Sequence, residues 1–370
     1  MKEPNSIFPI NATLRALGVL DKYRGILLHY SSRLLTFRRI YQNRTYRLSC
    51  WFLAAFIVYL PLALICGPAV LVIGPLIFGI PHLLSTYRYI PRFTGDSAKV
   101  RYRGMIFCGM AALFLCRIIF PSWSSSGAFP EIVAVLIGAS GMRWLSGDKI
   151  SKYITASLGI MLLIVALNWS PLVTVGFLAL AHNFVAFFYW IVSARSNSDR
   201  PLHAWAAFAL FAAATAFILT GGADGLVAIG GSFAPISAIP RLSGVVPHQI
   251  ARQIYPFGGS EVMLDRVIAA AALGQSLHYF VWLKAIPEEL QKSSVPFTFR
   301  RGFRLAVNDI GITAVMAVGI ATGLLLVGAV VLPALARQVY LCLAAAHGYL
   351  ELGALPAILA SNDGDSRDVT

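Results

Sequence analysis

Four of the seven histidines in this sequence lie inside long apolar stretches. They are His82, His182, His278 and His347, and Glu351 follows the last of them by four residues. An imidazole or a carboxylate is costly to place in hydrocarbon, so such groups mark functional sites by default. Residues four apart share one face of a helix, so His347 and Glu351 should project together. Because imidazole nitrogen binds iron, copper and zinc, these residues predict a metal site.

Two arrangements of the histidines agree with the sequence. His82 and His278 each lie shortly before a basic residue, about 9 Å above the inner boundary of a membrane helix. His182 and His347 lie roughly 10 Å nearer the bilayer centre by the same helical rise. If helix tilt removes this difference, four imidazoles surround one metal ion. If it does not, two histidine pairs result, and each pair would suit the two faces of a haem.

Iron held without haem is the cofactor that we expect, with haem or copper as the alternatives. Gln275, on the same helical face as His278, and Asn183, next to His182, are expected to fix imidazole tautomers from outside the ligand set. Tyr279 stands among several aromatic residues near the histidines. These aromatics are typical of the interfacial belt of a membrane protein, and they would also suit an apolar pocket for a lipid-like substrate or a porphyrin. The sequence assigns no catalytic residue.

The composition is that of a membrane protein, and it predicts an all-α, polytopic helical bundle. Hydrophobic residues make up 58% of the 370, charged residues 12%, and the mean hydropathy is +0.72. Soluble domains average about 25% charged residues. The net charge of +14 does not indicate nucleic acid as a partner, because the basic residues lie between the apolar stretches. The five cysteines have no CxxC spacing, so no disulfide framework and no thiolate metal site is expected.

About ten transmembrane helices are expected, with both termini in the cytoplasm. From Trp51 to Tyr87 the chain carries no charge, and this length suits two short spans that turn near Gly67-Pro68. With this count most Lys and Arg residues fall on the inner side, as the positive-inside rule requires. Within the spans, we expect Asp265 and Arg266 to find partners near the outer surface. The remaining spans are 104–120, 128–144, 153–169, 171–193, 202–220, 261–284, 305–331 and 336–360.

The chain divides into three parts by composition. Residues 1–49 are basic and predict a cytoplasmic amphipathic segment on an anionic leaflet, or a solvated basic tail. Residues 50–360 form the transmembrane domain, in which the long outer loop 221–260 is expected to act as a lid or a structural cap. Residues 361–370 are expected to be a disordered polar tail. We expect the protein in a bacterial cytoplasmic membrane.

One short element resembles a known family. The element Gly79-Ile-Pro-His82 is similar to the Gly-x-Pro-His element of the Brp/Blh family of bacterial β-carotene dioxygenases. That family consists of polytopic membrane proteins in which histidine-held iron cleaves a carotenoid. The resemblance implies an iron ligand for His82 alone. The family's element continues with Gly and then Asp, where this chain has Leu83, so what is implied is a class of site and not a carotenoid substrate.

Three functions remain open from the sequence. The favoured one is a membrane oxidoreductase whose metal, bound through histidine ligands, supports oxidative chemistry on a lipophilic substrate. The partners would then be the lipid bilayer, that small molecule and an electron donor. A haem-bearing electron carrier with paired histidines is the second, and a proton-coupled transporter that uses intramembrane His and Glu is the third.

Overall fold

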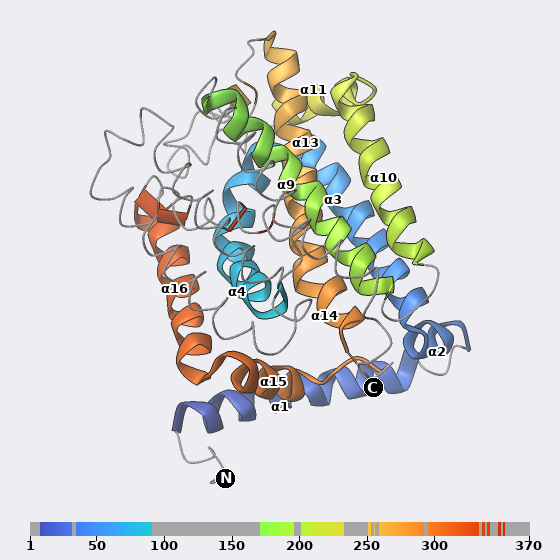
Figure 1. The fold of residues 1–370 in the computed structure, drawn as a ribbon, viewed down its shortest axis with the longest axis vertical. Helices are drawn as coiled ribbons and strands as arrows, with labels where there is room; N and C mark the ends of the chain where they lie inside the picture. Colours follow the sequence, from blue (N-terminus) through green and yellow to red (C-terminus); the bar gives the residue numbers. More distant parts are fainter. Residues whose placement is uncertain are drawn as a thin grey trace, which may run out of the picture.

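Every regular element in the described part of the chain is a helix (Figure 1). The computed structural model describes residues 8–31, 35–90, 171–195, 201–232, 251–252, 255, 259–291, 295–332, 335–336, 339–340, 347–348 and 351. The predicted all-α class is confirmed for these ranges. The helices are α1 (Phe8–Ser31), α2 (Leu35–Gln42), α3 (Arg44–Gly74), α4 (Ile80–Tyr89), α9 (Pro171–Arg195), α10 (Leu202–Leu219), α11 (Asp224–Ser232), α13 (Glu261–Phe280), α14 (Ile286–Glu289), α15 (Phe299–Ile310) and α16 (Ile312–Val331).

Side-chain caps mark where three of the helices begin. Asn43 accepts a hydrogen bond from the Tyr46 amide at the start of α3, at 3.1 Å. Ser260 and Thr298 do the same at the starts of α13 and α15. Such a cap satisfies one of the amide groups that the first helical turn leaves without a partner, and it contributes about 1 kcal/mol. The polar residue before each apolar run therefore decides where the helix starts.

Two described stretches are long and apolar enough to cross a membrane, namely Arg44–Tyr89 and Leu202–Leu219. A third would be the pair α15 and α16, if this bent pair forms one span. These stretches are consistent with insertion into a membrane. They do not amount to ten spans, and the expected spans 104–120, 128–144 and 153–169 lie outside the described residues, so the predicted count and topology stay a prediction.

The expected span 305–331 is broken in the structure, which corrects that prediction. Gly311 has a φ of 86°, and α15 meets α16 there at an angle of 112°. Only glycine adopts this left-handed backbone without strain, so the chain can turn sharply at this residue. Arg300, Arg301 and Arg304 make α15 too polar to continue the span, and none of its residues is buried. The apolar helix proper therefore begins at Ile312.

α3 runs antiparallel to α13 and α14 as far as a kink at Cys66, which has the non-helical angles φ −123° and ψ 24°. At the beginning of α3, Arg47 pairs with Glu288. At its other end, a Cβ on Gly67 would lie 3.1 Å from the Ile268 side chain. Sequence numbers rise along α3 while they fall along its partner, so the two helices run in opposite directions.

Beyond the kink the chain runs back along the same partner. The His82 ring lies against His278, and the Ser85 hydroxyl donates to the carbonyl of Trp282. Sequence numbers now rise together on both sides, so α4 is parallel to α13 (Figure 1). The reversal of chain direction expected near Gly67-Pro68 is therefore present at the Cys66 kink. Because of it, α4 packs in the bundle with a direction opposite to that of α3.

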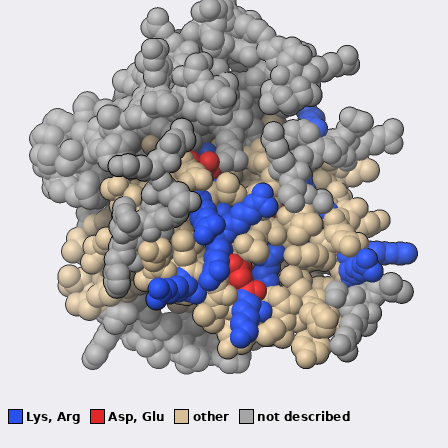
Figure 2. All heavy atoms as spheres, turned by 90° about the horizontal axis from the view of Figure 1, so that it is seen from below, with Lys and Arg blue, Asp and Glu red and all other residues tan. Residues whose placement is uncertain are grey.

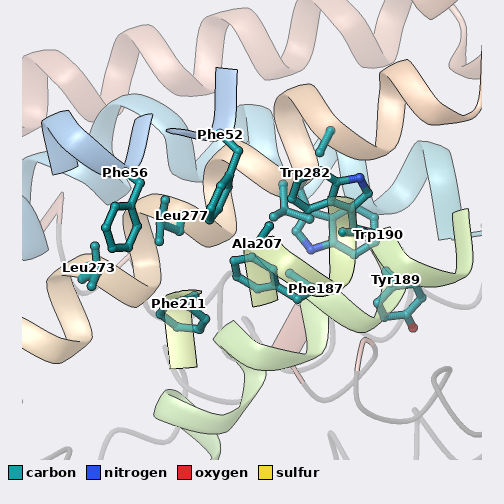
Figure 3. Close-up of a cluster of buried hydrophobic side chains, with 14 of the residues drawn as sticks. Phe52, Phe56, Phe187, Tyr189, Trp190, Ala207, Phe211, Leu273, Leu277 and Trp282 are labelled. Atoms are coloured by element: carbon teal, nitrogen blue, oxygen red, sulfur yellow. The ribbon is translucent and has the colours of Figure 1, made fainter. Parts of the chain in front are cut away.

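Aromatic side chains form the core that fixes α9 against α3 and α13 (Figure 3). Phe187 stacks on Phe211 of α10 with ring centroids 4.9 Å apart, and it meets the edge of Phe52 at 6.1 Å. Trp190 and Trp282 are fully buried beside them. Each aromatic pair contributes about 0.5–1.5 kcal/mol beyond its buried area. This core sets the position of α9, the helix that carries His182.

Buried charges at one end of the bundle tie α3 to α14. Arg47 and Glu288 form an ion pair whose side chains are each only 3% exposed. Lys284 reaches the other carboxylate oxygen of Glu288 at 2.8 Å. The neighbouring Glu289 accepts a hydrogen bond from His203 at 2.6 Å. The ion pair between Arg47 and Glu288 holds the start of α3 against α14.

Removing one member of the buried pair should destabilise the protein strongly. In the variant Glu288→Gln, the Arg47 guanidinium keeps its charge in a buried place without its carboxylate, so we expect a loss of about 3 kcal/mol in the free energy of unfolding. Denaturant unfolding in detergent measures this loss. The control is Asp224→Asn, which breaks the more exposed pair between Asp224 and Arg266 and should cost much less. Equal losses in the two variants would contradict the prediction.

We expected Arg266 to have a partner near the outer surface, and in the structure it pairs with Asp224. The Arg266 guanidinium donates to both carboxylate oxygens of Asp224, at 2.8 and 2.5 Å. This hydrogen bonding holds the pKa of the Asp224 carboxyl below its usual value. Asp224 begins α11, so part of the loop expected at 221–260 is helical, and residues 233–250 of that loop lie outside the described ranges.

Candidate metal centre

The centre is built around two histidines on parallel helices. His82 of α4 and His278 of α13 approach until their Nε2 atoms are 2.7 Å apart, with ring centroids 4.6 Å apart. Each residue is only 1% exposed. The antiparallel course of α3 and the return along α4 produce this meeting, because they bring residue 82 to the level of residue 278.

Two π-helical turns flank the pair, at Pro75–Gly79 and Val281–Ala285. Each turn ends two residues before a proline, Pro81 or Pro287. A proline inside a helix has no amide hydrogen for the preceding turn, and its ring clashes with the carbonyl four residues earlier. A π turn relieves this conflict by widening the helix locally, and such turns are frequent at functional sites. The prolines therefore set the local geometry from which both histidines project.

His347 and Glu351 complete a group of four. The Glu351 Oε1 atom lies 2.7 Å from Nε2 of His347, 3.6 Å from Nε2 of His82 and 3.8 Å from Nε2 of His278. All four donor atoms lie within 4.8 Å of one another. His347 is 4% exposed and Glu351 is 0% exposed. The two heights left open by the sequence thus coincide for these residues.

His182 lies at the edge of this group. Its ring centroid is 4.8 Å from that of His278 and 6.1 Å from that of His347. The compact set of four donors does not include it. The structure therefore brings all four predicted histidines to one place, with His182 beside the other three.

The donor set fits a metal ion. Donors bound at about 2.1 Å around one ion lie roughly 3–4 Å apart. Nε2 of His82 and of His278 lie in this range from Glu351 Oε1, at 3.6 and 3.8 Å, and Nε2 of His347 lies closer, at 2.7 Å. Among the described residues, the buried atoms Glu351 Oε2, His82 Nδ1 and His278 Nδ1 have no hydrogen-bond partner. A buried polar atom without a partner costs about 1–3 kcal/mol, and more if it is charged. An ion between the donors would neutralise the Glu351 carboxylate and offset part of this cost.

Polar side chains around Glu351 hold it in place. The Thr86 hydroxyl lies 3.2 Å from both Glu351 Oε1 and the His82 carbonyl, and it can donate to either. The Tyr189 hydroxyl donates to the Glu351 carbonyl at 2.9 Å. The sequence assigned neither residue to the metal site, although Thr86 stands one helical turn after His82. That spacing was the available signal for Thr86. Tyr189 lies seven residues, or about two helical turns, after His182 on α9 and is one of the aromatic residues that the sequence places near the histidines.

The expected role of Gln275 differs from its contact in the structure, and the expected role of Asn183 stays a prediction. Gln275 donates its amide hydrogen to the Tyr279 hydroxyl at 2.9 Å and not to an imidazole. A Cβ on Gly274 would lie 3.1 Å from the Asn183 amide nitrogen, so Asn183 packs against α13. Gln275 thus orients a tyrosine, and that tyrosine contacts the ring of His82 at a centroid distance of 5.2 Å.

Tyr279 belongs to a pair of tyrosines that the sequence did not indicate as a unit. Its hydroxyl lies 3.0 Å from the hydroxyl of Tyr340. The Tyr340 ring fits against α4 only because residue 79 is glycine, since a Cβ there would lie 2.1 Å from the ring. Gly79 therefore admits Tyr340, which holds Tyr279 against His82.

Adding a methyl group at Gly79 should disturb the centre. In Gly79→Ala the Tyr340 ring must move, so we expect a loss of about 1–3 kcal/mol in stability and weaker metal binding. Gly74→Ala is the matched control, because a Cβ there meets the Tyr279 ring at an ordinary 3.7 Å. Thermal unfolding and metal content of the two variants check this expectation, which fails if they behave alike.

The other end of α4 is anchored to α15. Arg88 donates to the Asp309 carboxylate at 2.6 Å, and both side chains are partly buried. Asp309 therefore has a cation partner in the structure. This contact and the Ser85 bond to Trp282 fix α4 to α15 and to the segment after α13, just beyond the turn that carries His82.

Comparison with known proteins gives no match: no family model, no curated protein and no solved structure matches this chain. The resemblance to the Brp/Blh family therefore stays a prediction. What the centre can do has to be argued from its own geometry.

Proposed function

We propose that this protein is an integral membrane metalloenzyme that carries out oxidative chemistry on a lipophilic substrate. The observation that carries the proposal is the buried group of His82, His278, His347 and Glu351. It is costly to bury three imidazoles and one carboxylate together. A bound cation is the simplest way to compensate this cost.

Iron suits this donor set best. Four protein donors leave two positions open on a six-coordinate ion, where a substrate or O2 can bind. Four donors would close a tetrahedral zinc ion and make its site structural. When bound, the iron would supply redox chemistry, while the chain supplies the geometry and a dry surrounding. Thr86 and Tyr189 hold Glu351 and so orient its carboxylate, and Tyr279 supports the ring of His82.

The packing of the rings argues against haem. The ring centroids of His82 and His278 are 4.6 Å apart, and those of His82 and His347 are 4.3 Å apart. The two Nε2 atoms of His82 and His278 are in hydrogen-bonding contact, so no macrocycle fits between them. One compact ion is therefore favoured over two haem sites.

A lipophilic substrate follows from the setting of the centre. α13 packs against α3. α4 belongs to the same stretch as α3, Arg44–Tyr89, which is long and apolar enough for a membrane. We place the protein in a bacterial cytoplasmic membrane, with about ten spans and an electron donor as its redox partner.

Metal analysis combined with an optical spectrum tests the proposal. Protein purified in detergent should contain about one iron per chain and lack the intense Soret absorption of haem. A Soret band would establish the haem alternative. Protein without metal that still moves a solute would support the transporter alternative and overturn the enzyme.

A further inference from the structure

α1 and α15 form a two-helix layer at one end of the bundle (Figure 1). The Asp21 carboxylate of α1 accepts hydrogen bonds from the amides of Phe299 and Arg300, at 2.7 and 3.1 Å. Arg300 in turn donates to the Leu14 carbonyl at 2.9 Å. An aspartate that caps another helix in this way fixes both helices in one orientation. Gly18 of α1 also lies against the Arg300 side chain, so one side of α1 faces α15.

The face of α1 that points away from α15 is apolar and exposed. Each of its members has another member three or four residues away along the helix, so they lie on one side of it. An exposed apolar face of this length marks a surface that contacts another phase or molecule. Its large side chains, which are between 43% and 70% exposed, are Val19, Leu20, Tyr23, Ile26, Leu27 and Tyr30.

A row of basic residues runs beside this apolar face. Arg15, Lys22 and His29 are exposed and seven residues apart, so they lie one above another along α1. Arg301 and Arg304 of α15 are exposed as well. Figure 2, which views the molecule from this end, shows Lys and Arg side chains gathered across its middle. The layer thus combines an apolar face with a cationic one.

The connections of the layer place it at the membrane surface. α1 leads through the short α2 into the apolar stretch Arg44–Tyr89. α15 leads through the 112° bend at Gly311 into the apolar helix α16. Near the start of the first stretch, Lys284 lies over the Trp51 ring at 5.5 Å, an arrangement typical of the interfacial belt. Both helices of the layer are therefore held at the level where the apolar helices begin.

We propose that the α1–α15 layer is an interfacial anchor that inserts the apolar face of α1 into an anionic lipid leaflet. The basic row then lies among the lipid phosphates, and Tyr23 and Tyr30 lie at the boundary between headgroups and acyl chains. Charge and position both favour anionic phospholipid as the occupant over a second protein. The inference does not depend on the metal centre.

Photocrosslinking of the full chain in lipid nanodiscs tests the anchor. A photoreactive p-benzoylphenylalanine replaces Tyr23 on the apolar face, in nanodiscs of phosphatidylglycerol and phosphatidylethanolamine. The matched control places the same residue at Gly25, where a Cβ meets nothing within 4 Å and a large side chain is tolerated. Two residues turn the helix by about 200°, so the control points away from the apolar face. We expect a several-fold higher yield of lipid adduct, measured by mass spectrometry, at position 23.

Two outcomes would overturn the anchor. Equal lipid yields at the two positions would show that the apolar face has no special contact with lipid. Adducts between two chains at position 23 would show that a second copy covers it. The preference for anionic lipid is tested separately. The adduct yield at position 23 should fall when the nanodiscs contain only phosphatidylcholine. The double variant Arg15→Gln, Lys22→Gln should remove this dependence of the yield on lipid charge. If the yield with Arg15 and Lys22 unchanged is the same in both lipids, the preference for anionic lipid is refuted.

Discussion

The variant His278→Ala is expected to lose the metal ion. Nε2 of His278 lies 2.7 Å from Nε2 of His82 and 3.8 Å from the Glu351 carboxylate, so its removal opens the donor group at the centre. Loss of a residue that only orients a ligand costs 10–100-fold in affinity, so loss of a ligand should cost at least about a hundredfold. Metal content after purification and titration with ferrous ion measure the change.

Two further variants make this result specific. Glu351→Gln keeps the shape of the side chain and removes its negative charge, so it should also weaken binding strongly. His29→Ala changes an exposed histidine of α1 and should leave the metal content unchanged. If His278→Ala and His29→Ala retain equal metal, the four-residue group is not the binding site.

Removal of the metal is expected to destabilise the native protein. An ion that binds only the folded chain stabilises it by about 4 kcal/mol when its free concentration is a thousand times the dissociation constant. Without the ion, the wholly buried Glu351 carboxylate keeps a negative charge close to three imidazoles, and its Oε2 atom has no partner among the described residues. Thermal unfolding with and without a chelator measures the difference.

The matched control is the same experiment on His278→Ala. Because that variant has no metal to lose, its unfolding temperature should not respond to the chelator. A chelator effect of equal size in both proteins would mean that the stabilising ion binds elsewhere. No effect in the native protein would argue against a bound ion.

Local patterns were enough for part of the fold. The uncharged run from Trp51 to Tyr87 predicted two helices with a turn at Gly67-Pro68, and the contacts of α3 and α4 show that reversal. The same method failed at 305–331, because apolar length alone does not reveal that Gly311 adopts a positive φ. A backbone angle of this kind depends on where the neighbouring helices, such as α1 with its Asp21 cap, can be placed.

The sequence alone was enough to identify the residues of the centre, because polar groups in apolar stretches have a high free-energy cost of burial. Imidazole and carboxylate groups in apolar stretches need compensation, which identified His82, His278, His347 and Glu351 without any contact information. Counting residues from the nearest charges put them at two heights, because that count assumes straight helices of uniform rise. Tilted helices break this assumption, because residues at the same depth then lie at different distances along their helices from the membrane boundary.

The sequence by itself determined that the chain is helical and apolar, and which side chains need a partner in the interior. Only the tertiary structure decided that three Nε2 atoms meet at one carboxylate oxygen, that His182 lies beside them, and that Gln275 serves a tyrosine. The physical reason is that burial cost belongs to a single residue and its local stretch. The distance between two side chains depends on how whole helices pack, and a shift of one turn in α4 would separate His82 from His278.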